Sequence, residues 1–309
     1  MSKIILVATE KPFAKEAVDL MKAVVGKNAG YEMRLLEKYT ETSQLLDAVK
    51  DAHAMIIRSD KATKEVIEAG KELKVIVRAG AGYDNIDLAA ATEKGVIAMN
   101  TPGQNSNAVA ELAIGMMVYM ARGKFNGKSG TELKGKTLGI HAYGNVGKYV
   151  AAIAKGFGMD IYAFDPFVKA EDIEKDGVKV LGSVEELYSK CQYVSLHIPA
   201  NEKTKRSIHK GLLGSMPKNA VLVNTARKEV VCEEGLKMIF EQRPDFKYLS
   251  DIAPDCAAEL EEKYADRVYF TPKKMGAQTE EANINAGVAA VEQIIAYFEK
   301  GDNRFQVNK

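Results

Sequence analysis

The sequence has few cysteines, almost no excess charge and no long apolar run. Its 309 residues include three cysteines, Cys191, Cys232 and Cys256, an odd number without the spacing of a metal site. This argues against a disulfide framework and a bound metal, and it favours a cytoplasmic protein with reduced thiols. The formal net charge of +1 leaves no basic surplus for a nucleic acid and no acidic tail.

Membrane and repeat signals are also lacking. No apolar run approaches the roughly 20 residues that cross a bilayer. The apolar run over 4–8 is too short for a signal peptide, and it predicts a first buried strand. What remains is the composition of a globular protein, 46% hydrophobic and 28% charged, long enough for two domains. We therefore expect neither a membrane nor a nucleic acid as partner.

The segment 137–147 (TLGIHAYGNVG) combines a short apolar strand, a glycine turn and the start of a helix. This geometry presents backbone N–H groups and the positive end of a helix dipole to a phosphate. The next predicted strand ends in Asp165, close to the spacing of an acid that bonds a ribose hydroxyl. Ala142 stands where the dinucleotide fingerprint has its first glycine, so an ordinary tight turn is the alternative.

Short β-branched runs alternate with amphipathic helices along most of the chain. This predicts an α/β fold of two Rossmann-like or flavodoxin-like units, each a parallel sheet covered on both faces. We expect domains at 1–100 plus 277–309 and at 101–276, with a ligand cleft between them and a final helix returning to the first domain. The predicted strands are 4–8, 32–36, 55–57, 75–77, 96–99, 137–141, 161–164, 178–180, 193–198, 221–224, 248–252 and 268–271.

Polar residues follow four of these strands, and each also has an ordinary structural explanation. Arg78 precedes a glycine turn and could pair with an anion, or lie on the surface. Arg227 has the planar fork that suits a carboxylate, or a surface salt bridge. His197 could be a hydrogen-bonded structural residue, and Lys273 with Lys274 could form a solvated turn.

The order of these segments, however, matches a known family. The blocks are 73–88 (LKVIVRAGAGYDNIDL), 95–112 (GVIAMNTPGQNSNAVAEL), 130–147, 193–208, 221–227 (VLVNTAR) and 271–282 (TPKKMGAQTEEA). Along nearly its full length the chain resembles the D-isomer-specific 2-hydroxyacid dehydrogenases, and its first two blocks resemble the phosphoglycerate branch.

The resemblance implies hydride transfer with NAD. The expected reaction is oxidation of D-3-phosphoglycerate to 3-phosphohydroxypyruvate, the first step of serine biosynthesis, so the expected partner is a phosphorylated 2-hydroxy acid. Two alternatives stay open: reduction of glyoxylate or hydroxypyruvate, and a non-catalytic NAD-binding scaffold. The region 108–136 matches the part through which family members dimerise, so a homodimer is expected.

The resemblance also assigns roles to residues. Asp165 would hold the adenosine ribose and favour NAD over NADP, because a 2′-phosphate would meet a carboxylate. Arg227 would clamp the substrate carboxylate and polarise the C2 oxygen, and Asp251 would bond the nicotinamide carboxamide. The expected cofactor residues are Tyr143, Gly144, Asn145, Val146, Asp165, Pro166, His197, Pro199, Thr204, Thr225, Ala226, Arg227, Asp251 and Gly276. The expected substrate residues are Arg58, Ser59, Lys61, Arg78, Gly80, Ala81, Gly82, Asn107 and Arg227.

The chain departs from the family at the acid/base. Family members usually carry histidine after Thr-Pro, and glutamate five residues after the aspartate that matches Asp251. Here Lys273 and Lys274 follow Thr-Pro with one extra residue, and Cys256 replaces the glutamate. The two losses are consistent, because a paired carboxylate would raise the pKa of a lysine that is already too basic. We expect Lys273 to be the acid/base, with Lys274 as the alternative.

Overall fold

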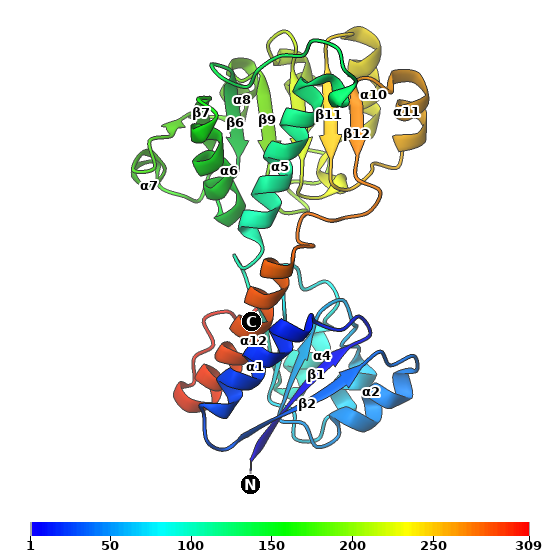
Figure 1. Ribbon diagram of the computed structural model, residues 1–309, viewed down its shortest axis with the longest axis vertical. Helices are drawn as coiled ribbons and strands as arrows, with labels where there is room; N and C mark the ends of the chain where they lie inside the picture. The colour runs from blue at the N-terminus through cyan, green and yellow to red at the C-terminus, as the bar shows by residue number, and fades with distance from the viewer. Residues whose placement is uncertain (1, 309) are drawn as a thin grey trace. The chain divides into compact units, whose positions relative to one another are not determined.

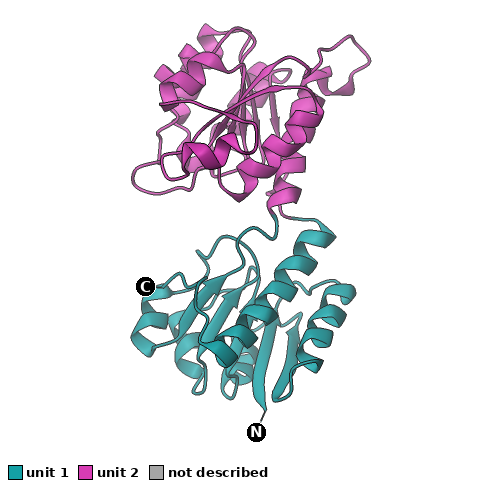
Figure 2. Cartoon of the chain, turned by 90° about the vertical axis from the view of Figure 1, so that its left-hand side faces the viewer, with its two compact units in different colours: residues 1–105, 278–309 teal, residues 106–277 magenta. Residues whose placement is uncertain are grey.

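The computed structural model describes residues 2–308 (Figure 1). The chain forms two compact units, unit 1 (Met1–Asn105 with Gln278–Lys309) and unit 2 (Ser106–Ala277), coloured separately in Figure 2. Each unit is a parallel sheet with helices on both faces, which confirms the predicted α/β fold class. The assignment of substrate to one unit and NAD to the other stays a prediction.

Unit 1 contains a five-stranded sheet in the order β2-β1-β3-β4-β5. Its strands are β1 (Lys3–Thr9), β2 (Tyr31–Glu37), β3 (Ala54–Ile57), β4 (Val75–Arg78) and β5 (Ile97–Asn100). Its helices are α1 (Lys15–Gly26), α2 (Thr42–Val49), α3 (Lys64–Ala69), α4 (Leu88–Lys94) and α12 (Glu280–Lys300).

Alternate side chains of the unit 1 strands enter two different cores. In β1, Ile5 and Val7 pack toward α1 and α12, whereas Leu6 and Ala8 pack toward α2, α3 and α4. Burial of each such isoleucine, valine or leucine stabilises the fold by roughly 1.5–3 kcal/mol. The predicted return of the last helix is confirmed, since α12 packs beside α1 on the first sheet (Figure 1).

Unit 2 contains a seven-stranded sheet in the order β12-β11-β10-β9-β6-β7-β8. Its strands are β6 (Thr137–His141), β7 (Asp160–Phe164), β8 (Lys179–Val180), β9 (Tyr193–Leu196), β10 (Val221–Asn224), β11 (Lys247–Ser250) and β12 (Val268–Phe270). Its helices are α5 (Ser106–Ala121), α6 (Asn145–Gly156), α7 (Ala170–Glu174), α8 (Val184–Lys190), α9 (Lys210–Ser215), α10 (Glu233–Gln242) and α11 (Ala257–Tyr264), with two short 3-10 helices, η1 (Gly123–Phe125) and η2 (Lys228–Val230).

The order of the unit 2 strands determines where a ligand can enter. Strand β6 pairs with β7 on one side and with β9 on the other, so the strand order reverses beside β6. Open parallel sheets bind ligands at the carboxyl ends of the strands, next to such a reversal. Helices α5, α6 and α7 cover one face of this sheet, and α8 to α11 cover the other.

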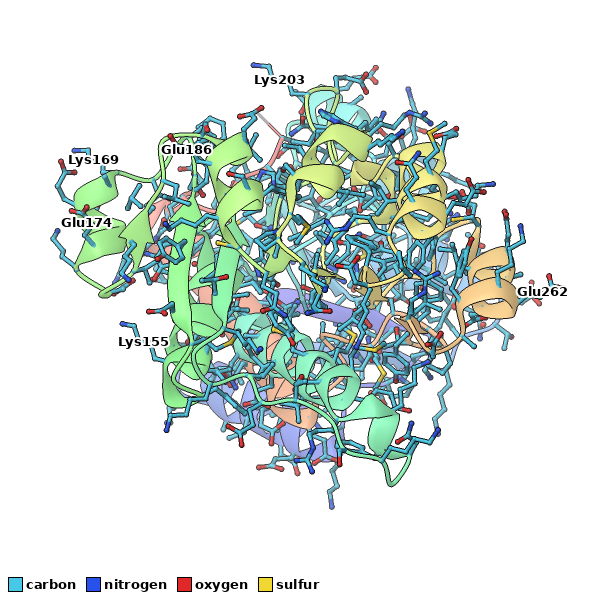
Figure 3. All side chains as sticks on the ribbon, turned by 90° about the horizontal axis from the view of Figure 1, so that it is seen from above. Lys155, Lys169, Glu174, Glu186, Lys203 and Glu262 are labelled. Carbon is cyan, nitrogen blue, oxygen red and sulfur yellow. The ribbon has the colours of Figure 1, made fainter. Side chains whose placement is uncertain are left out.

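A strand lies at each of the predicted positions, with ends that differ by a few residues. Strand β11, for example, ends at Ser250 rather than at 252, because the Ser250 hydroxyl donates to the carbonyl of Ile252 at 2.7 Å and turns the chain. None of the helices within residues 2–308 is long and apolar enough to span a bilayer. The charged side chains labelled in Figure 3, such as Lys155, Glu186 and Glu262, project outward and are exposed.

Candidate active site

The glycine turn after β6 is shaped by close backbone packing. Ala142 has φ of 79°, a left-handed conformation that costs a non-glycine residue about 1 kcal/mol. A Cβ at Gly147 would lie 2.5 Å from the carbonyl oxygen of Ala142, so only glycine allows α6 to start this close to the strand. The N-cap of α6 is Gly144, which has no side chain to bond the first N–H groups of the helix. Those groups are therefore available to an anion.

Asp165 fastens this turn to the end of β7. Its Oδ2 accepts from the N–H of Tyr143 at 2.7 Å, and its Oδ1 accepts from the N–H groups of Phe167 and Val168 at 2.8 and 3.1 Å. A carboxylate offers about four acceptor positions, so capacity for a ribose hydroxyl remains. Tyr143 itself is fully buried and donates its hydroxyl to Asp176 at 3.0 Å, so the turn presents its backbone rather than its ring.

Two histidines lie at the ends of neighbouring strands, and both stay neutral. Burial lowers the pKa of His141 to about 4, and burial with the nearby His141 ring lowers the pKa of His197 to about 3. Nδ1 of His141 lies 3.4 Å from the Tyr188 hydroxyl. Nε2 of His197 and Oγ1 of Thr225 are buried, with no hydrogen-bond partner among the residues that the structure describes. Such orphan groups are costly unless a ligand completes them.

The turn that carries Arg227 is held by a buried asparagine. Nδ2 of Asn224 donates to the carbonyl of Arg227, and its Oδ1 accepts from the N–H of Ala226, both at 2.9 Å. Arg227 is half-buried and donates from Nη1 to the carbonyl of Ala226 at 2.9 Å. Because a guanidinium has five N–H groups, this leaves the fork able to bind a carboxylate.

Asp251, after β11, meets the segment that carries the two lysines. Its Oδ1 accepts from the Thr271 hydroxyl at 3.0 Å and from the N–H of Met275 at 2.8 Å, and its Oδ2 accepts from the N–H of Gly276 at 2.9 Å. Asp251 is 1% exposed, whereas Lys273 and Lys274 are exposed. The structure therefore brings Asp251, Thr271 and Gly276 together, with both lysines between the bonded ends.

The position of the family's glutamate holds a buried thiol. Burial raises the pKa of Cys256 to about 12, so this side chain stays protonated and cannot act as a base near neutral pH. A carboxylate reaches this loop from another element, since Glu233 of α10 accepts from the N–H groups of Asp255 and Cys256 at 2.7 and 3.0 Å. Asp255 also pairs with Lys228. The contacts of Glu233 and Asn224 were not predicted from the sequence, although an asparagine in the turn after a strand is a signal for the latter.

In unit 1, two arginines lie where β3 and β4 end. Arg58 donates to the carbonyls of Lys11 and Pro12 at 3.3 and 3.1 Å and to Oδ1 of Asn283 at 2.5 Å. Its guanidinium also stacks 4.9 Å from the ring centre of Phe13. These contacts hold Arg58 firmly, and they occupy part of the fork that the sequence assigned to the substrate.

The position of the Arg78 guanidinium depends on Gly80, two residues later. Its Nε donates to the carbonyl of Arg58 at 3.1 Å. Gly80 has φ of 148°, and a Cβ there would lie 1.6 Å from Nη1 of Arg78. Gly80 is therefore required for this guanidinium to lie against the backbone of the turn. Ser59 and Lys61 are exposed just beyond β3.

Other predicted residues of unit 2 lie at the start of α5 or in the loops that follow β7 and β9. Asn107 donates to Glu111 within α5 at 2.7 Å. Pro166 and Pro199 are exposed, and the Thr204 hydroxyl donates to the carbonyl of Pro199. Across residues 2–308, no cluster of histidine, cysteine, aspartate and glutamate could hold a metal ion.

Comparison with known proteins adds four findings. Residues 5–308 match the family described as D-isomer specific 2-hydroxyacid dehydrogenase, catalytic domain. A crystal structure of NAD+-bound 3-phosphoglycerate dehydrogenase from Entamoeba histolytica is 46% identical, with a TM-score of 0.88 over 100% of this chain and 99% of that chain. D-3-phosphoglycerate dehydrogenase from Methanocaldococcus jannaschii is 39% identical over 81% of this chain and 51% of its own length, so this chain spans about half of that relative. Hydroxypyruvate reductase from Thermotoga maritima is 35% identical over 92% of this chain and 95% of its own length.

Proposed function

The chain belongs to the D-isomer specific 2-hydroxyacid dehydrogenase family, and from this premise we propose that it oxidises D-3-phosphoglycerate to 3-phosphohydroxypyruvate with NAD. The observation that carries the proposal is the likeness, over the whole chain, to an NAD+-bound 3-phosphoglycerate dehydrogenase. Arg58 and Arg78 at the strand ends of unit 1 support a substrate with two anionic groups, because guanidinium forks suit phosphate and carboxylate.

The residues of unit 2 fit NAD. The uncapped N-terminus of α6 suits a pyrophosphate, and Asp165 keeps acceptor capacity for a ribose hydroxyl while repelling a 2′-phosphate. The orphan atoms of His197 and Thr225 are polar groups that a bound ligand would satisfy. When bound, NAD supplies the acceptor for the hydride from C2.

The protein must remove the proton of the substrate hydroxyl. We assign this role to Lys273, with Lys274 as the alternative, because no histidine follows Thr271-Pro272. Arg227 would bind the substrate carboxylate and favour the neutral form of a nearby amine. An unperturbed lysine has a pKa of about 10.4, so oxidation should quicken toward alkaline pH.

We also propose that the protein is a cytoplasmic homodimer. Phe125 and Phe157 support a dimer, because these large apolar side chains are 66% and 41% exposed beside the packed pair α5 and α6. The three cysteines are free thiols, as a reducing compartment allows.

A steady-state assay tests the substrate. NADH oxidation is followed with 3-phosphohydroxypyruvate, hydroxypyruvate and glyoxylate in parallel. We expect kcat/KM to favour the phosphorylated substrate by about 10- to 100-fold, the worth of one charge-assisted phosphate contact. A preference for hydroxypyruvate would support the reductase function of the Thermotoga maritima relative. Tight NADH binding without turnover of any substrate would support a non-catalytic scaffold.

A further inference from the structure

The segment 271–276, here called the lysine loop, is fastened at both ends to one side chain. Thr271 at its start and Met275 with Gly276 at its end all donate to the carboxylate of Asp251. The Thr271 hydroxyl also lies 2.7 Å from the carbonyl oxygen of Asp251. Since both ends of the segment are bonded to the same carboxylate, the stretch that carries Lys273 and Lys274 forms a closed loop whose two ends are fixed.

The sequence of the loop is adapted to this attachment. A Cβ at position 276 would lie 2.9 Å from Oδ2 of Asp251 and 3.3 Å from a methyl of Val109, so glycine lets the backbone N–H reach the carboxylate. The buried carboxylate of Asp251 is stabilised by the donors of the lysine loop through charge-assisted hydrogen bonds.

We propose that Asp251 is a positioning residue that fixes where the lysine loop presents its proton-transferring amine. The inference rests on the proposed function, because it takes one of the two lysines as the acceptor of the proton. In that step the C2 hydroxyl of the substrate would lose its proton to Nζ of the lysine, and NAD, when bound, would accept the hydride from C2. The role of Asp251 is to hold Nζ within reach of that oxygen.

The same carboxylate can also accept from a ligand. Oδ2 accepts from the N–H of Gly276 at 2.9 Å, and each carboxylate oxygen has two acceptor positions. A ligand that donates an N–H to Oδ2 at the carboxyl end of β11 would therefore share Asp251 with the lysine loop. Cofactor binding and lysine placement would then be coupled through one side chain.

Asp251→Asn separates this role from a purely structural one. The amide keeps the shape and can still accept from Thr271 and Met275, but its NH2 group cannot accept from Gly276, so one end of the loop is released. The matched control is Asp245→Asn. Asp245 precedes β11, at the opposite end of the strand, and accepts from the N–H of Asn219 at 2.6 Å besides pairing with Arg243.

The experiment combines two measurements on the full-length protein. Hydrogen exchange of the segment 268–279 without ligands reports the attachment itself. The pH profiles of kcat and KM, measured on the preferred 2-hydroxy acid, report the position of the base. We expect the amide of Gly276 to exchange at least about tenfold faster in Asp251→Asn, and kcat to fall about 10- to 100-fold, with a smaller change in KM.

The pH profile should move as well. Loss of a carboxylate near a lysine disfavours the charged amine, so the alkaline limb of kcat should shift to lower pH in Asp251→Asn and stay in place in Asp245→Asn. Unchanged exchange in Asp251→Asn would overturn the inference. Faster exchange with an unchanged kcat and pH profile would also overturn it, because the attachment would then be structural alone. A wild-type protein that turns over none of the three assayed substrates would overturn the proposed function first, and this inference with it.

Discussion

Asp165 and Asp251 follow two different strands of the same sheet, and the carboxylate of each accepts three hydrogen bonds that include at least one from a loop after a neighbouring strand. The loops differ in content. Asp165 holds the glycine turn with its uncapped N–H groups, whereas Asp251 holds the loop that carries both lysines. In the proposed function, one type of strand-end carboxylate would shape both the binding of the cofactor and the placement of the base.

The two aspartates differ in how far along the chain their partners lie. Two partners of Asp165 are two and three residues away, whereas the partners of Asp251 are 20 to 25 residues away. The first arrangement leaves a local signature, and the second exists only because β12 pairs beside β11. Substitutions in the two regions should therefore affect different steps.

The largest effect is expected at the tip of the lysine loop. Replacing the proton-transferring lysine by alanine should lower kcat about 100- to 10,000-fold, since that is the usual contribution of a positioned acid/base. Lys273→Ala and Lys274→Ala are assayed separately for D-3-phosphoglycerate oxidation, with the exposed Lys155→Ala on α6 as control. If both loop variants retain near wild-type kcat, neither lysine is the base.

Asp165→Asn should weaken cofactor binding rather than chemistry. The amide releases part of the glycine turn and removes the charge that opposes a 2′-phosphate. We expect the Kd for NADH to rise about 10- to 100-fold, and the preference for NADH over NADPH to shrink. Fluorescence titration with both cofactors measures this. An unchanged preference would mean that Asp165 only supports the turn.

His141, at the end of β6 beside the glycine turn, should make unit 2 sensitive to acid. Its pKa is lowered by burial to about 4 from an ordinary 6.5. Between these two pH values His141 is protonated in the unfolded chain but neutral in the folded chain. The free energy of unfolding therefore decreases as pH falls from 6.5 toward 4. The loss from this one residue is about 3 kcal/mol.

Urea unfolding at pH 7 and pH 4.5 tests this expectation for wild type and His141→Gln. The variant should lose less unfolding free energy between the two pH values. An equal loss would show that other groups, such as His197, govern the acid sensitivity.

The smallest effect is expected at the left-handed Ala142 of the glycine turn. Ala142→Gly removes a backbone strain of about 1 kcal/mol but adds freedom to the unfolded chain, so stability should rise by less than about 1 kcal/mol. Thermal unfolding measures this change, and NADH titration checks that the turn still binds. A clear loss of stability in Ala142→Gly would contradict the claim that the left-handed conformation of Ala142 is strained.

Much of the fold was predictable because its signals are local. Runs such as Ile4 to Val7 are buried on both faces of a sheet, so β-branched residues occur without polar alternation. The position of Asp165 just after a strand was predictable for the same reason, since a turn, a helix and a strand separate it from Gly144 at a regular spacing, whereas its role toward a ribose stays a prediction. Boundaries such as the end of β11 depend on single side chains, here Ser250, and were missed.

The supporting contacts of the site could not be predicted in this way. Glu233, at the start of α10, accepts from the backbone of the loop at Cys256, and no spacing in the sequence predicts that contact. The glycine at position 80 suggests a close approach of some group to the turn. That this group is the Arg78 guanidinium, and that a Cβ would exclude it, is visible only in the folded structure. The attachment of the lysine loop could be predicted only from the strand order, because the pairing of β11 with β12 brings Thr271 and Gly276 to Asp251.

The pH dependence of D-3-phosphoglycerate oxidation with NAD tests the central claim most directly. A lysine base predicts that kcat rises from neutral toward strongly alkaline pH, and that the rise disappears when Lys273 or Lys274 is replaced by alanine. A flat profile in the wild-type protein, or turnover confined to unphosphorylated substrates, would contradict the account.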